Sequence, residues 1–216
     1  SQDWPRMLGP NDDAIADQWR IDWFNDGSLP LAWHIRVGEG YGNAVSMPGR
    51  LFHFDRYAEN ERLTCYQTQD AKELWRLEFP VQYEDSFGYN NGPRAMPVTD
   101  GRYVAAMGAA GRLVVADASS GELLWEKATL EEFNVEPNFF GVGATPCIYG
   151  DKLIVMIGGS PKTSRRVGIG RLKDQIGDGS AIVAFELTTG RELYRTGNYL
   201  ASYSAPVIQK IGNQDI

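Results

Sequence analysis

The sequence has few of the residues that usually build a metal centre, a redox site or a nucleophile. Among 216 residues there are two cysteines and two histidines. Cys65 and Cys147 lie far apart in apolar segments, which is typical of buried thiols, with a disulfide between them as the alternative. His34 and His53 lack the close spacing of a metal-binding pair, and no Gly-x-Ser-x-Gly motif occurs. We therefore predict no metal site and no nucleophilic hydrolase.

Positive charge and long apolar runs are also scarce. The chain has 21 Lys and Arg against 28 Asp and Glu, a net charge of -7. Binding to a phosphate backbone needs clustered basic side chains, so we expect no nucleic-acid partner. The longest apolar stretches, such as residues 152–157, are much shorter than the roughly 20 residues that cross a bilayer. No membrane span is expected.

The most informative feature that is present is a repeat. Three segments run from an apolar stretch through a turn into an aromatic residue, at residues 69–75, 119–125 and 188–194. Their aromatic residues are Trp75, Trp125 and Tyr194, and the turn has Gly121 and Gly190 in the last two copies but Ala71 in the first. A repeated unit of this kind needs its neighbours to bury its apolar face.

Each repeat contains four strand-like segments with Gly-containing turns between them, which predicts an all-β fold of β-propeller blades. We expect blades at residues 43–79, 94–128 and 143–197, the last with an insertion at 160–178. Residues 1–30 are then an N-terminal extension, 31–37 a separate fourth strand and 204–216 the start of a further blade. Such a set does not close a ring, so we expect about half a propeller, with the remaining blades elsewhere in the full-length chain.

Two segments resemble a known family. Residues 116–125 (ADASSGELLW) resemble the tryptophan-docking repeat of the pyrroloquinoline-quinone (PQQ)-type propellers, and residues 3–11 (DWPRMLGPN) look like the start of a secreted bacterial subgroup of them. The resemblance implies eight blades when complete, docking of each tryptophan between adjacent blades, and a periplasmic or secreted location. It extends to quinone enzymes and to the outer-membrane assembly lipoprotein of the same architecture, so it implies the fold more firmly than the activity.

Quinone enzymes of this family stack the cofactor in the funnel, usually against a disulfide of adjacent cysteines, and hold Ca²⁺ with Glu, Asn and Asp oxygens. This chain has no adjacent Cys pair and no Cys-x-x-Cys-His motif. We therefore expect a non-catalytic binding or scaffold propeller without a cofactor. The alternative is a PQQ- and Ca²⁺-dependent alcohol or sugar dehydrogenase whose site is completed by other blades.

The loops that lead from one blade to the next should form the mouth of the funnel. They concentrate aromatic, Asn and Arg residues that suit a sugar, a peptide or a protein partner, because rings stack while amides orient the ligand. The candidate binding residues are Tyr41, Asn43, Tyr89, Asn91, Arg94, Asn138, Phe140 and Tyr203. The alternative is that these aromatics only fill the channel, and that Arg94 pairs with Glu84 or Asp85.

The insertion at residues 160–178 is locally basic in an acidic protein. Its basic residues are Lys162, Arg165, Arg166, Arg171 and Lys173. Such a loop is either a docking site for an anionic surface or partner, or a solvated and mobile insertion.

Overall fold

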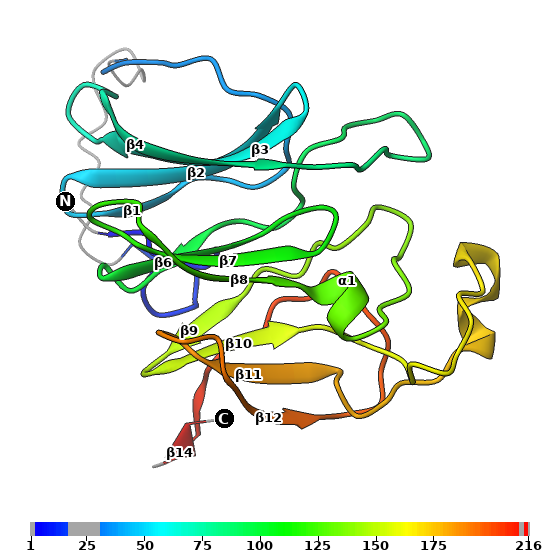
Figure 1. Ribbon diagram of the computed structural model, residues 1–216. Helices are drawn as coiled ribbons and strands as arrows, with labels where there is room; N and C mark the ends of the chain where they lie inside the picture. The colour runs from blue at the N-terminus through cyan, green and yellow to red at the C-terminus, as the bar shows by residue number, and fades with distance from the viewer. Residues whose placement is uncertain (1–2, 17–30, 212–213, 216) are drawn as a thin grey trace.

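The computed structural model describes residues 3–16, 31–211 and 214–215. In that part of the chain, three four-stranded antiparallel sheets are stacked face to face, with their long connecting loops on one side (Figure 1). The predicted all-β blade architecture is therefore confirmed. No helix among the described residues is long and apolar enough to cross a membrane.

In every sheet, spatial order follows chain order or its reverse, so each blade is a simple meander. The first blade contains β1 (Val45–Met47), β2 (Arg50–Tyr57), β3 (Asn60–Gln67) and β4 (Glu73–Pro80). The second contains β5 (Val98–Thr99), β6 (Tyr103–Met107), β7 (Arg112–Asp117) and β8 (Leu123–Ala128), followed by the short helix α1 (Thr129–Glu132). The third contains β9 (Cys147–Tyr149), β10 (Lys152–Met156), β11 (Ile182–Glu186) and β12 (Glu192–Thr196), with the 3₁₀ helix η1 (Ile169–Asp174) in its insertion.

Each blade has the same irregularity between its third and fourth strands. The register shifts after the residue that pairs with the repeat aromatic: Cys65 opposite Trp75, Val115 opposite Trp125 and Ala184 opposite Tyr194. A bulge increases the local twist of a strand pair. The repeated sequence motif therefore corresponds to a repeated backbone geometry as well as to a repeated aromatic.

The apolar faces of the blades form two main cores. Phe52, Leu63 and Cys65 of the first blade pack with Val104 and Val114 of the second. The opposite face of the second blade packs against the third, through Val115 of one and residues such as Phe185 of the other. Alternating side chains of β6 and β7 thus serve two interfaces, which is why these strands are almost continuously buried.

The repeat tryptophans join each blade to the next. The indole nitrogen of Trp75 donates a hydrogen bond to the carbonyl oxygen of Ala118 (3.1 Å), and that of Trp125 donates to Leu187 (2.8 Å). Each acceptor immediately precedes the turn of the following blade. A hydrogen bond of this kind satisfies the only polar atom of a half-buried indole.

Residues 31–37, predicted as a fourth strand, form no strand, and the next bridge along the chain joins Glu39 to Arg56. The reason is that a strand needs a hydrogen-bonded neighbour, and no described strand pairs with these residues. Trp33 nevertheless donates from its indole nitrogen to the carbonyl oxygen of Thr68 (2.9 Å). Thr68 precedes the turn of the first blade, so Trp33 makes the contact of a fourth-strand tryptophan without the strand.

The N-terminal extension is packed against the blades. Trp4 pairs with Ser46 of β1, and the carbonyl oxygen of Pro5 accepts a hydrogen bond from Thr99 of β5 (3.0 Å). Further along, Arg6 and Leu8 line a small hollow. Its lining also includes Pro146, which leads into β9, and Cys147, the first residue of β9. The segment therefore crosses the first strand of each blade; residues 17–30 lie outside the described part.

Beyond the third blade, the predicted start of a further blade at residues 204–216 has no strand before Lys210. The chain instead makes a short pair, β13 (Lys210–Ile211) with β14 (Gln214–Asp215). Ile208 packs on the outer face of the third blade, against Cys147 and Ile154. Tyr194, the repeat aromatic of this blade, is 46% exposed, because the described residues contain no following blade on which it could dock.

Both cysteines are free and buried, as the sequence indicates. Burial raises the pKa of the Cys65 thiol to about 11 and also raises that of Cys147. A thiol with a raised pKa is a poor nucleophile at neutral pH. The two cysteines are therefore structural.

Candidate functional site

The long loops gather around a pocket of about 420 Å³ at the mouth of the blades. It is lined by one residue of the N-terminal segment, the chain before β1, and the loops that precede the second and third blades and follow the third. The lining residues are Met7, Tyr41, Asn43, Tyr89, Arg94, Met96, Phe140, Gly143, Thr145 and Tyr203. Residues more than 190 positions apart thus meet at one site.

Six of the eight candidates from the sequence line this pocket: Tyr41, Asn43, Tyr89, Arg94, Phe140 and Tyr203. The other two lie outside it and have structural contacts. Asn91 accepts a hydrogen bond from the backbone nitrogen of Asp85 (2.8 Å), and Asn138 accepts one from that of Phe139 (2.8 Å). In the structure these two amides therefore shape the loops.

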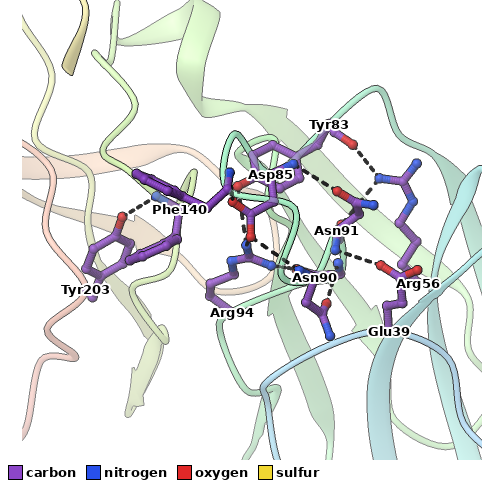
Figure 2. A network of polar contacts seen from close by, with 11 residues as sticks. Glu39, Arg56, Tyr83, Asp85, Asn90, Asn91, Arg94, Phe140 and Tyr203 are labelled. Atoms are coloured by element: carbon purple, nitrogen blue, oxygen red, sulfur yellow. Dashed lines mark hydrogen bonds and ion pairs between the residues drawn. The ribbon is translucent and has the colours of Figure 1, made fainter.

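Asp85 organises the loop between the first two blades (Figure 2). Its carboxylate accepts hydrogen bonds from the backbone nitrogens of Phe87 (2.9 Å) and Asn90 (3.3 Å) and faces Arg94. These contacts, that of Phe87 foremost, hold the pKa of Asp85 below its usual value. The loop is thus folded around one ionised carboxylate.

Two further contacts hold the same loop, one to the segment before β1 and one to β2 (Figure 2). The Glu39 carboxylate accepts a hydrogen bond from the backbone nitrogen of Asn91 (2.7 Å). Arg56 donates to the carbonyl oxygen of Tyr83 (2.6 Å). Because both ends of the loop are held, the side chains that it presents to the pocket are preorganised.

Arg94 forms an ion pair with Asp85, one of the two partners that the sequence offered as an alternative to ligand binding, and its Nη2 lies 3.1 Å from Oδ2. The two side chains are 8% and 0% exposed. Arg94 also donates to the carbonyl oxygen of Gly92 (2.5 Å) and lies over the rings of Tyr41 and Tyr83, 4.9 and 5.3 Å from their centroids. Its Nε is buried without an acceptor among the described residues. The guanidinium is therefore neutralised by one partner but retains an unused donor.

A row of aromatic rings crosses the mouth. Phe87 stacks on Tyr89 with ring centroids 6.1 Å apart and contacts Phe140 at 5.6 Å, and Phe140 contacts Tyr203 at 6.0 Å. The Tyr203 hydroxyl accepts a hydrogen bond from the backbone nitrogen of Phe140 (2.6 Å; Figure 2), while burial raises the Tyr203 pKa. Tyr89 remains 72% exposed, so the row offers open ring faces at the rim.

The sequence interpretation missed four lining residues: Met7, Met96, Gly143 and Thr145. Met7 comes from the N-terminal extension, whose path across the blades has no sequence signal of its own. The others belong to the segments leading into β5 and β9, which are almost continuously buried and therefore have no alternating pattern that could have identified them. Thr145 accepts a hydrogen bond from the backbone nitrogen of Met96 (3.1 Å), so these two segments are joined at the pocket.

The described residues do not fit a quinone and Ca²⁺ site of the kind that the family resemblance implies. The pocket lining has no carboxylate to hold a cation. Nowhere in the described ranges do three His, Cys, Asp or Glu side chains form a group that could bind a metal. Arg94, the one cation of the lining, already pairs with Asp85. No cofactor chemistry follows from this set of side chains.

Comparison with solved structures supports the fold. A quinohemoprotein alcohol dehydrogenase from Comamonas testosteroni has a TM-score of 0.58 at 19% identity, over 89% of this chain and 27% of its own. A europium-containing methanol dehydrogenase has a TM-score of 0.50 at 12% identity, over 76% of this chain and 26% of its own. The chain thus spans about a quarter of the length of these enzymes. At such identities the likeness concerns the fold alone.

Sequence comparison gives the family. No curated protein matches the chain. A family model described as outer membrane protein assembly factor BamB matches residues 11–194, which include the first two blades and the third up to the middle of β12. The chain therefore belongs to this family of PQQ-like β-propellers.

Proposed function

We propose that this protein is a non-catalytic binding module, which takes an uncharged group of a sugar or peptide ligand in its mouth pocket. The observation that carries the proposal is the buried pair of Arg94 and Asp85. The pair has no net charge, and its arginine lies over the rings of Tyr41 and Tyr83. The pocket beside it therefore combines aromatic surface with neutral hydrogen-bonding groups, a combination that suits uncharged ligands.

The remaining polar groups support this choice. Asn43 provides an amide, Thr145 a hydroxyl and Arg94 an N–H without an acceptor. General acid–base chemistry near neutral pH needs a group that titrates there. The described residues that line the pocket include no His, Asp, Glu, Cys or Lys, and the pKa of Tyr203 is raised further from neutrality. This composition favours binding over catalysis.

The family membership supports a protein as the natural source of the ligand group. Its matching model is named for outer membrane protein assembly, a process in which the named protein works with other proteins. We accordingly extend the proposal to a peptide segment of a protein partner and to a periplasmic or secreted location. Cell fractionation of the source organism, with the protein in the periplasmic or secreted fraction, is the expected result for location.

Ligand-observed NMR tests the binding site. Saturation transfer from the full-length protein is measured to glucose, maltotriose and an acetylated, amidated Gly-Tyr-Gly peptide, with glucuronate as the charged comparison. We expect transfer to at least one uncharged probe, less to glucuronate, and loss of transfer in Tyr89→Ala and Asn43→Ala. Tyr57→Ala is the matched control, because Tyr57 is exposed and outside the pocket. Absence of transfer to every uncharged probe, or equal loss in the control, would show the proposal to be wrong.

The dehydrogenase alternative has its own test. The full-length protein is incubated with PQQ and Ca²⁺, and dye reduction is followed with primary alcohols and with sugars. A binding module gives the background rate. Dye reduction faster than in the sample without protein would overturn the non-catalytic proposal, whatever the NMR result.

A further inference from the structure

The insertion between β10 and β11 projects on the same side as the mouth loops (gold in Figure 1). Within residues 160–178 it has five basic residues and only two acidic ones, Asp174 and Asp178. The chain as a whole has a net charge of -7. The insertion is thus a positively charged region on an acidic protein, and it faces the side where the proposed ligand enters.

The base of the insertion is fixed by side chains of the preceding loop. The Asn134 amide donates to Ser160 Oγ (3.1 Å) and to the carbonyl oxygen of Pro161 (2.9 Å). The buried Glu136 carboxylate accepts hydrogen bonds from the backbone nitrogens of Val167 (2.9 Å) and Gly168 (3.1 Å). These contacts hold the backbone in one conformation, which argues against the solvated, mobile alternative.

Most of the positive charge of the insertion has no ion-pair partner in the part of the chain that the structure describes. Arg171 pairs with Asp174 at 2.9 Å, and Asp178 lies 3.9 Å from Arg195. Among the described residues no ion pair involves the other four basic side chains, which are exposed: Lys162, Arg165, Arg166 and Lys173. A fixed backbone therefore presents four available cations within twelve residues.

We propose that these four residues, which we call the basic platform, form a docking site for an acidic segment of a partner protein. Arg165 and Arg166 suit carboxylates because the planar guanidinium donates two parallel hydrogen bonds. Charges attract over roughly 10 Å at moderate ionic strength, so a short acidic segment interacts mainly with the basic platform. An extended anionic surface such as a membrane would also face the acidic remainder of the protein, which favours the peptide.

The platform adjoins the mouth but is separate from the pocket. Gly168 shares a hollow of about 370 Å³ with Tyr83 and Phe139, while no residue of the insertion lines the mouth pocket. A single partner could thus contact both places, but the platform does not depend on the pocket. Failure of one proposal would leave the other intact.

Fluorescence anisotropy tests the platform with a labelled ten-residue peptide of Asp, Glu and Gly, and a peptide in which Gln and Asn replace the acids. The full-length protein is compared with the double variant Arg165→Glu/Arg166→Glu. The control is Arg36→Glu/Lys72→Glu, which changes the net charge equally at exposed positions outside the insertion. Circular dichroism melting of each variant confirms that it is folded.

We expect the acidic peptide to bind, and its affinity to fall as salt is raised from 50 to 200 mM. The affinity of the platform variant for this peptide should be lower by about tenfold or more. The control should stay within about threefold. Equal binding of the neutral peptide, an equal loss in the control, or no binding of the acidic peptide would each overturn the proposal. Sedimentation with phosphatidylglycerol vesicles completes the test, because platform-dependent vesicle binding without peptide binding would assign the surface to a membrane instead.

Discussion

The indole of Trp75 lies directly over the α-carbon of Gly121 in the next blade. A β-carbon added to Gly121 would come within 2.6 Å of the indole ring, and the glycine has a φ of +77°. Gly190 has the same relationship to Trp125, with a closest approach of 2.7 Å and a φ of +69°. The turn glycine of the repeat therefore meets two needs: a left-handed backbone and space for the tryptophan of the preceding blade.

We predict that Gly121→Ala destabilises the protein more than a left-handed backbone alone explains. The backbone cost for alanine is about 1–2 kcal/mol, and overlap with the ring adds roughly 1–3 kcal/mol. Gly49→Ala is the matched control, because Gly49 has a φ of +75° with nothing within 4 Å of an added β-carbon. Urea unfolding of both variants gives the difference. In a Trp75→Ala background the extra loss should vanish, and its persistence would contradict the steric explanation.

We predict that Ala71→Gly stabilises the protein. Ala71 occupies the equivalent turn of the first blade with a φ of +57°. Glycine relieves a strain of about 1–2 kcal/mol but gives the unfolded chain more freedom, at about 0.5–1 kcal/mol. The expected net gain is roughly 0.5–1 kcal/mol by urea unfolding. Ala32→Gly, at an exposed residue without positive φ, should give no gain; a gain of the same size there would refute this explanation.

We predict that Glu61→Gln flattens the pH dependence of stability. Glu61 of β3 is buried, and this burial raises its carboxyl pKa despite a hydrogen bond from the backbone nitrogen of Ala109 (2.7 Å). Because the pKa of Glu61 is higher in the folded state, its stabilising contribution is fully present below the unfolded-state pKa. This contribution is lost as pH rises through the folded-state pKa. Glutamine keeps an acceptor for Ala109 without the buried charge.

The measurement for Glu61→Gln is thermal unfolding between pH 4.5 and 7.5. The melting temperature of the variant should rise relative to that of the wild type as pH rises, and should equal or exceed it at pH 7. Glu84→Gln, at an exposed residue, should follow the wild-type curve. Parallel curves for wild type and Glu61→Gln would show that the buried carboxylate carries no such cost.

We predict that Glu136→Ala loosens the insertion while leaving the blades folded. The variant loses the acceptor for the backbone nitrogens of Val167 and Gly168, and Lys162, Arg165 and Arg166 offer trypsin sites nearby. Limited trypsin digestion followed by mass spectrometry should show several-fold faster cleavage at these residues. Glu131→Ala, at an exposed position of α1, is the control. Unchanged cleavage in Glu136→Ala would mean that the carboxylate does not hold the loop.

Local signals were enough to predict the blades. Gly-containing turns between short apolar runs predict hairpins, and the repeat of Trp75 and Trp125 places equivalent strands in each unit. The same signals located the mouth, because in a stack of meanders the loops between blades all lie on one side. Six of eight candidate residues consequently line one pocket, whereas their role in binding remains a proposal.

Long-range contacts decided the rest. Residues 31–37 have the composition of a strand, but strand formation depends on a partner elsewhere in the chain; only the docking of Trp33 on Thr68 keeps the repeat pattern there. The pocket lining includes Met7, which tertiary contacts bring to the mouth. The sequence by itself determined the repeating units and their order, since these follow from local periodicity. The tertiary structure alone decided that Asp85 and not Glu84 neutralises Arg94, and that Glu136 fixes the basic insertion, because both depend on the conformation of loops that have no periodic pattern.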